Sequence, residues 1–553
     1  MADEPNPKRP PLLQPGDRPP APGDPSPTFG PPVPTEEQPS RSRRRMFSII
    51  ALITAFALLV AALGVQTWRL QHAGARASAT APTSPAVNPA SPPSSSAPPS
   101  SPPSSTPPTT TTPLPPGLQQ FANIPGIRCI ADLFGNPPRA RINRTTLLSQ
   151  LQSVASWDED ARELQFKQVP EPVLLTRAGL ADRVARDVSN SYSTQDADLD
   201  SRLLSSLGAV PAAYDMRNAT TSLYGNQVAG FYDPTTKQLI VGSNDGRKPL
   251  DVLGEVTLAH ELVHALTDQA LGLPPLDVTT SPTGVLDTDR TTAQRSVVEG
   301  DATLVMYRYV LSALSLQQQQ QFLNDPSLRN QAGAVAVPHF LEAQLMFPYA
   351  AGLDFVCALK QSSGWATVNA AYSQPPTTSA QVLFPDRFVA REAAIDPPDP
   401  GALGAPWSKD RAQTLGAADL LALFEAPGDD RNATLENPKG LVASWAGGET
   451  VQWSDGARTA VGVSLVERRN GGGGASSLAF RPTQQTTTAP GPLCNAMRDW
   501  YTKAFPLSTT GGQTGDEIAA WTGDRQSAVL RCAGTNVRLG IGPDIATART
   551  IAQ

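Results

Sequence analysis

An uninterrupted apolar run extends from Met46 to Val65 and contains no charged residue. About 20 apolar residues are enough to cross a bilayer as a helix, and Trp68 follows where an interfacial aromatic side chain is typical. The basic cluster Arg41-Ser-Arg-Arg-Arg45 directly precedes the run. By the positive-inside rule, this cluster predicts a cytoplasmic N-terminus and an extracytoplasmic remainder. We therefore predict a single transmembrane helix over residues 46–68; a cleaved signal peptide is the alternative.

The segments on either side of this run have no periodic apolar pattern. Residues 1–45 are rich in proline and charge, which predicts a disordered cytoplasmic tail. Residues 69–117 consist mainly of Ala, Ser, Thr and Pro, a composition typical of a semi-extended linker. We expect this linker to lie outside the cytoplasm, where it could bring the protein into contact with a cell wall.

From residue 118 onward, helical and strand periodicities alternate, which predicts an α+β fold. Two parts are expected: a mainly helical domain with a small sheet over residues 118–399, and an α+β C-terminal lobe over residues 400–553. The expected helices cover residues 147–164, 173–207, 252–271, 291–314, 414–424 and 495–505. The expected strands cover residues 227–233, 238–242, 441–445, 450–453, 459–466, 528–532 and 536–541. A Pro-containing turn separates the first two strands, so we expect a hairpin that forms either scaffold or an edge for an extended ligand.

The helix over residues 252–271 contains His260-Glu261-Leu262-Val263-His264, a complete H-E-x-x-H motif. Residues four apart share one face of a helix, so both imidazoles can bind one metal ion. In this motif the histidines bind zinc, and the glutamate acts as the general base of a metalloprotease. The chain has only 4 histidines, and two of them fall in this motif. We therefore predict a Zn²⁺ site at His260 and His264, with Glu261 as a catalytic residue.

A catalytic zinc ion usually has a third protein ligand and one open position. A third histidine six residues after His264 is excluded, because that position is Ala270. A carboxylate from the helix over 291–314 is the alternative, and Glu299-Gly300-Asp301-Ala302 lies inside that helix. The small residues Gly300 and Ala302 would allow this helix to approach the first one closely.

Two segments resemble a known family. His260-Glu261-x-x-His264, followed 35 residues later by Glu299 in a Val-Glu-Gly-Asp-Ala context, is similar to the gluzincin group of zinc metallopeptidases, whose best-known fold is that of thermolysin. Segments between Tyr224 and Phe388 also resemble minimal bacterial gluzincin-like proteins. The resemblance implies a zincin-like catalytic domain with His260, His264 and Glu299 as metal ligands and Glu261 as the residue that activates water.

The sequence departs from the family pattern at one position. Many gluzincins carry Asp four residues after the ligand Glu, and this chain has Thr303 there. Asp301 or Asp268 could instead orient a ligand imidazole, or both could be ordinary surface carboxylates. For the group that stabilises the oxyanion, the candidates are Tyr349, His339 and Tyr309. We favour Tyr349, which lies in a Pro-Tyr-x-x-Gly setting, against the alternative of an ordinary packed tyrosine.

Composition narrows the partners and the compartment. The net charge is −6 and the folded region has no basic stripe, which argues against nucleic acid as a partner. The four cysteines form no CxxC pair, so zinc is not held by thiolates. Outside the cytoplasm, an even number of cysteines predicts disulfides. Three pairings are possible, and we favour Cys494–Cys532, which closes within the C-terminal region, together with Cys129–Cys357.

These observations predict a membrane-anchored extracytoplasmic zinc metallopeptidase that acts on a peptide or protein substrate. The alternative is a catalytically inactive zincin-fold protein that serves as a binding or scaffold protein of the cell envelope. Thr303 and the unassigned oxyanion donor favour that alternative.

Overall fold

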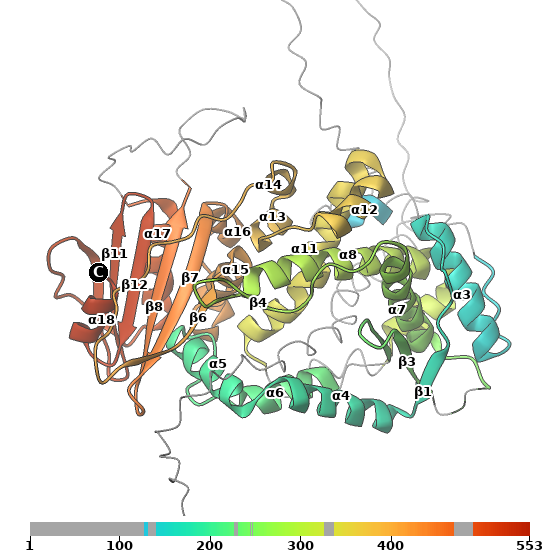
Figure 1. Ribbon diagram of the computed structural model, residues 1–553, viewed down its shortest axis with the longest axis horizontal. Coiled ribbons are helices and arrows are strands. Elements are labelled where there is room, and N and C mark those ends of the chain that lie inside the picture. Colours follow the sequence, from blue (N-terminus) through green and yellow to red (C-terminus); the bar gives the residue numbers. More distant parts are fainter. Residues whose placement is uncertain are drawn as a thin grey trace, which may run out of the picture. The chain divides into compact units, whose positions relative to one another are not determined.

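The computed structural model describes residues 126–130, 140–225, 230–243, 245, 247–325, 337–468 and 490–553 (Figure 1). All of them belong to one compact unit of the chain. The predicted cytoplasmic tail, transmembrane helix and linker lie outside the described residues. Among the helices of the described residues, none is both long enough and apolar enough to cross a membrane.

Three long helices form the helical part of the fold: α7 (Val252–Ala270), α8 (Thr288–Ala313) and α11 (His339–Ser363). The Asp251 side chain caps α7 by accepting from the Gly254 N–H at 2.8 Å, and Asp287 caps α8 by accepting from Arg290 N–H. The side chains from Leu253 to Thr267 are buried all around α7. A helix that is buried on every face belongs to the interior of a large domain.

The most extensive helix–helix contact in this part joins α8 to α11 (Figure 1). A Cβ atom added at Gly300 would lie 2.2 Å from the backbone of Gly352, and one added at Gly352 would lie 2.3 Å from the Ser296 carbonyl oxygen. Gly300 therefore permits α8 to approach α11. The expectation that it serves contact with α7 is wrong, because periodicity shows which residues share a face but not which neighbour that face meets.

The remaining helices surround this core or cover the larger sheet. They are α2 (Ile127–Ile130), α3 (Leu147–Arg162), α4 (Arg177–Ser191), α5 (Thr194–Ser206), α6 (Met216–Gly225), α9 (Leu316–Leu323), α12 (Trp365–Ser373), α13 (Ser379–Leu383), α14 (Pro385–Val389), α15 (Ala417–Glu425), α16 (Pro438–Val442), α17 (Pro492–Ala504) and α18 (Ile545–Ile551), with 3-10 turns η5 (Pro427–Asp429) and η6 (Arg431–Ala433).

A small three-stranded sheet lies against α7 and has the order β1-β3-β2. The predicted hairpin is confirmed: β2 (Gly230–Asp233) and β3 (Gln238–Gly242) pair in antiparallel fashion, with Tyr232 opposite Leu239. The third strand, β1 (Pro172–Leu175), pairs parallel to β3. Residues 173–175 were expected to be helical, so this part of the prediction is wrong. β2 forms one edge of the sheet.

The larger sheet has nine strands in the order β4-β5-β6-β7-β8-β12-β11-β10-β9 (Figure 1). Its strands are β4 (Thr279–Thr280), β5 (Val285–Asp287), β6 (Ser408–Thr414), β7 (Trp445–Ser454), β8 (Thr459–Glu467), β9 (Thr509–Thr510), β10 (Glu517–Thr522), β11 (Ser527–Ala533) and β12 (Asn536–Gly542). The predicted closing hairpin is confirmed by the antiparallel pairing of β11 with β12. The segment predicted as a strand over 441–445 instead begins in α16 and enters β7 only at Trp445.

The predicted fold class is wrong and is corrected to a mixed α/β fold with two sheets. It called for a transmembrane helix, and none of the described helices qualifies. It also called for one small sheet beside a separate lobe, whereas β5 pairs parallel to β6, with Val285 opposite Ala412. The strands β4 and β5 are too short to produce a recognisable alternation, so their membership of the sheet could not be read from the sequence.

Both expected disulfides are confirmed, and no free cysteine remains. Cys129 joins α2 to Cys357 on α11, across 228 residues. Cys494 joins α17 to Cys532 on β11.

Candidate metal centre

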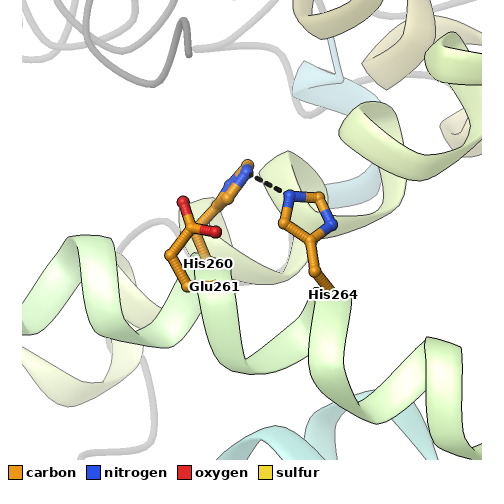
Figure 2. A group of neighbouring side chains, drawn as sticks. All are labelled: His260, Glu261 and His264. Carbon is orange, nitrogen blue, oxygen red and sulfur yellow. Dashed lines mark hydrogen bonds between the residues drawn. The ribbon is translucent and has the colours of Figure 1, made fainter. Parts of the chain in front are cut away.

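The motif residues of α7 gather on one side of the helix, as Figure 2 shows. His260, Glu261 and His264 are all buried, and one potential ligand atom from each lies within 4.8 Å of the others. The two imidazoles are separated by one helical turn, and their Nε2 atoms are 3.0 Å apart. The spacing of the motif thus brings two imidazole nitrogens to one point, as expected from i, i+4 geometry.

Glu299 of α8 completes a triangle of potential ligand atoms. Its Oε2 atom lies 3.3 Å from Nε2 of His260 and 3.3 Å from Nε2 of His264. Zinc binds nitrogen and oxygen ligands at about 2.0–2.1 Å, and a tetrahedral site of that size has ligand-to-ligand edges of about 3.3 Å. The observed edges of 3.0, 3.3 and 3.3 Å fit a zinc ion bound by these three residues.

Two carboxylates lie close to the histidines, and their hydrogen bonds distinguish them. Glu299 directs one oxygen at both imidazoles. Glu261 instead accepts from the backbone N–H of Tyr232 on β2, at 2.8 Å. This contact anchors Glu261 beside the metal position without placing it between the imidazoles. The sequence showed the hairpin but did not indicate that β2 holds Glu261.

Burial and the charges of neighbouring groups shift the pKa values of His260, His264 and Glu299. Burial lowers the pKa of His260 to about 4. Burial opposes the charged form of His264, but Glu299, Glu261 and Asp301 outweigh it and raise the pKa of His264 to about 9. Although burial opposes its charge too, Glu299 has a pKa far below its ordinary value, because His264 and the imidazole hydrogen bonds stabilise the carboxylate. Metal binding at these ligands must therefore release the proton of His264.

The pKa of Glu261, the carboxylate of the motif, is shifted in the opposite direction from that of Glu299. Burial raises the pKa of Glu261 to about 7, with a smaller contribution from the charge of Glu299, while His264 and the Tyr232 N–H oppose the shift. A general base works best when its pKa lies near the working pH. Glu261 can therefore both take up and return a proton near neutrality.

Asp268 and Asp301, the two candidates for orienting a ligand imidazole, bind other groups. Asp268 accepts from the Tyr232 hydroxyl at 2.8 Å and from Lys237 Nζ at 2.5 Å, which fastens the hairpin to α7. Asp301 pairs with Arg162. The Nδ1 atoms of His260 and His264 have no hydrogen-bond partner in the described part of the chain.

Of the three candidate oxyanion donors, only Tyr349 lies at the site. Its ring stacks on that of His260, with centroids 6.2 Å apart and an interplanar angle of 22°. Tyr309 donates its hydroxyl to Glu255 at 2.7 Å. His339 lies at the start of α11, 3.1 Å from Glu425. The structure thus brings His260, Glu261, His264, Glu299 and Tyr349 together and places Tyr309 and His339 elsewhere.

A cavity of about 250 Å³ reaches the centre from the side of Glu299 and Tyr349. Its walls come from α5, α6, α8, α11, β6 and α15.

No protein-family model, no curated protein and no solved structure matches this chain.

Proposed function

We propose that this protein is an extracytoplasmic zinc metallopeptidase that hydrolyses peptide bonds. One observation carries the proposal: Nε2 of His260, Nε2 of His264 and Oε2 of Glu299 lie 3.0–3.3 Å apart, with a further carboxylate, Glu261, beside them. Three protein ligands that leave one position open are typical of catalytic zinc, whereas structural zinc usually has four. Two imidazoles with one carboxylate suit zinc among the divalent ions.

The proposed roles follow from the position of each side chain. When bound, zinc supplies a Lewis acid that polarises a carbonyl group and makes a water molecule more acidic. Glu261 accepts the proton of the attacking water and returns it to the amine that leaves. The Tyr232 N–H holds the second carboxylate oxygen in place for both transfers. Tyr349 is assigned the stabilisation of the oxyanion, because it lies against His260 at the end of the cavity.

The small sheet offers a route for the substrate. β2 is an edge strand, and the Tyr232 N–H points away from β3 toward Glu261. An extended peptide that lies along a strand edge presents its amide groups at regular intervals. A peptide beside β2 would therefore have a backbone carbonyl close to Glu261 and the metal position.

The proposed location outside the cytoplasm is supported by the cysteines. All four are joined in the disulfides Cys129–Cys357 and Cys494–Cys532. Such bonds persist in oxidising compartments and are rare in the reducing cytosol.

The test compares metal content with peptide hydrolysis. Wild-type protein should bind about one zinc ion and cleave members of a mixed peptide library. Glu261→Gln should retain the metal and lose about 10²- to 10⁴-fold in kcat, because it removes only the general base. Glu299→Gln should lose metal affinity, because an anionic carboxylate ligand is replaced by a neutral amide, which is a weaker ligand.

Two outcomes would contradict the proposal. Full activity of Glu261→Gln would exclude the assigned mechanism. A zinc-loaded wild type that cleaves no peptide would favour the alternative of a metal-binding scaffold protein. Glu342→Gln, which removes a carboxylate from the surface of α11, is the control for general effects of Glu-to-Gln substitution.

A further inference from the structure

The cavity beside Glu299 and Tyr349 has room for a long side chain but is small for a whole ligand molecule. Its volume is about 250 Å³, smaller than the 300–1,000 Å³ typical of pockets for whole small molecules. Since it reaches the metal ligand Glu299, a residue next to the bond under attack could extend into it.

The walls of this cavity are largely apolar. Its apolar lining includes Leu203 and Leu204 of α5, Phe340 and Leu341 of α11, and Leu415 just before α15. All five side chains are at most 9 % exposed. An aliphatic stem would find a dry surface here, which disfavours short polar side chains.

Two charged side chains on the wall already have a partner of opposite charge or a backbone acceptor. Asp200 lies 2.6 Å from Arg411 Nη2 and accepts from the Tyr192 hydroxyl. Arg295 donates to the Leu276 carbonyl at 3.1 Å and lies one helical turn, about 6 Å, from Glu299. Asp200 therefore needs no cation from a ligand.

Asp419 is different, because its hydrogen bonds come only from neutral donors. It accepts from Gln344 Nε2 and from the Gly416 N–H, each at 2.9 Å. Within the described residues, no basic side chain forms an ion pair with it. Burial raises the pKa of Asp419. Burial, followed by the charge of Asp419 itself, raises the pKa of the nearby Asp289 to about 7. Asp419 is therefore a carboxyl group on the cavity wall that has no ion-pair partner among the described residues.

The spacing along α11 indicates how far a ligand must reach. Gln344, which holds Asp419, lies five residues before Tyr349, a rise of about 7.5 Å. A long side chain suits a separation of this order between Glu299 and Asp419. Lysine and arginine combine such a length with an aliphatic stem and a cationic end.

We propose that this cavity is a specificity subsite for a lysine or arginine side chain of the substrate. The aliphatic stem packs between α5 and α11, and the cation pairs with Asp419. This inference rests on the proposed peptidase function and adds the class of residue that the enzyme selects.

The test uses peptides that differ only in the residue on one side or the other of the cleaved bond: Lys, Arg, norleucine or Glu. Norleucine has the aliphatic stem of lysine without the charge. Wild-type, zinc-loaded protein should cleave the Lys and Arg peptides with kcat/KM about 10- to 100-fold above norleucine, the range of a hydrogen bond to a charged group. The Glu peptide should be the poorest.

Two variants alter the proposed acidic end. Asp419→Asn removes the charge, and Gln344→Lys places an internal cation beside it. Both should bring the Lys-to-norleucine ratio to about 1 or below. Gln344 is exposed, so Gln344→Lys is compatible with folding even if Asp419→Asn lowers stability. Glu342→Gln changes the charge of the same helix without lining the cavity and should keep the wild-type ratio.

The outcomes separate the two proposals. Suppose that the norleucine peptides are cleaved with a kcat/KM equal to or higher than that of the Lys peptides, on both sides of the cleaved bond. That result would overturn the subsite and leave the peptidase function intact. If no peptide is cleaved, the peptidase function fails, and equilibrium binding of the same peptides to wild-type protein decides the subsite. Tighter binding of the Lys peptide than of its norleucine counterpart supports the subsite, and equal binding overturns it.

Discussion

Removing the charge of Asp301 should destabilise the helical core strongly, because that charge balances a fully buried arginine. Arg162 and Asp301 have no exposed side-chain surface, and Arg162 Nε lies 2.9 Å from both carboxylate oxygens. Tyr372 donates its hydroxyl to the same carboxylate at 2.9 Å, and Asn369 accepts from Arg162 Nη2 at 2.6 Å. The guanidinium also lies 4.1 Å from the centroid of Trp365. These contacts join α3, α8 and α12. Asp301 lies on α8, two residues after Glu299.

The expected loss in the free energy of unfolding depends on which buried group each substitution leaves without its partner. Asp301→Ala leaves the guanidinium buried without a counter-charge, which costs about 3–5 kcal/mol. Arg162→Met leaves the carboxylate with a single donor and should cost a similar amount. Tyr372→Phe removes one hydrogen bond to a charged group and should cost about 1.5–3 kcal/mol. The double variant Arg162→Met/Asp301→Ala removes both charges, so its cost should be smaller than the sum of the single costs by up to about 3 kcal/mol.

The assay is denaturant unfolding of the full chain, with the free energy of unfolding compared in a double-mutant cycle. Intrinsic tryptophan fluorescence, to which Trp365 beside Arg162 contributes, follows the unfolding. Arg431→Met is the matched control, because Arg431 pairs with Glu342 on the surface and should contribute less than about 1 kcal/mol. The reasoning is refuted if Asp301→Ala costs no more than the control. Additivity of the two single substitutions would refute the claim that the charges stabilise one another.

Two further predictions concern stability. Gly300→Ala should cost about 3 kcal/mol or more, because its Cβ would lie 2.2 Å from the Gly352 backbone. The control Gly404→Ala should be nearly neutral, because its Cβ would meet nothing within 4 Å. Equal melting temperatures for the two variants would contradict this prediction. Burial raises the pKa of Asp289 to about 7, so its contribution to stability is complete below pH 4 and is lost as the pH rises through 7. Asp289→Asn should therefore remove a slope of up to about 1.4 kcal/mol per pH unit between pH 4 and 7, and unchanged unfolding curves across that range would argue against it.

Much of the local structure could be predicted from the sequence. The helix that carries His260 and His264, the hairpin of β2 and β3, and the closing hairpin of β11 and β12 were all expected within a few residues of their bounds. Each depends on periodicities and turn residues that act over a few positions. The meeting of the two imidazoles follows from i, i+4 spacing alone, so the sequence was sufficient to predict it.

Contacts between segments that lie far apart in the sequence could be predicted only where a family resemblance, or the small number of possible cysteine pairings, limited the choice of partner. Glu299 was proposed as third ligand from the resemblance to gluzincins, and the fold brings its oxygen within 3.3 Å of both histidines. The disulfide pairing was one of three possibilities. By contrast, periodicity did not reveal that Gly300 faces α11 or that Asp301 pairs with Arg162.

The sequence by itself therefore determined the H-E-x-x-H motif and the elements that carry it, whereas the tertiary structure decided their surroundings. Only the fold showed that the Tyr232 N–H holds Glu261, that β5 joins the larger sheet beside β6, and that Asp419 lines the same cavity as Glu299. The reason is physical. A helix or hairpin is specified by neighbours in the chain, but the partner of a buried side chain depends on how several elements pack at once.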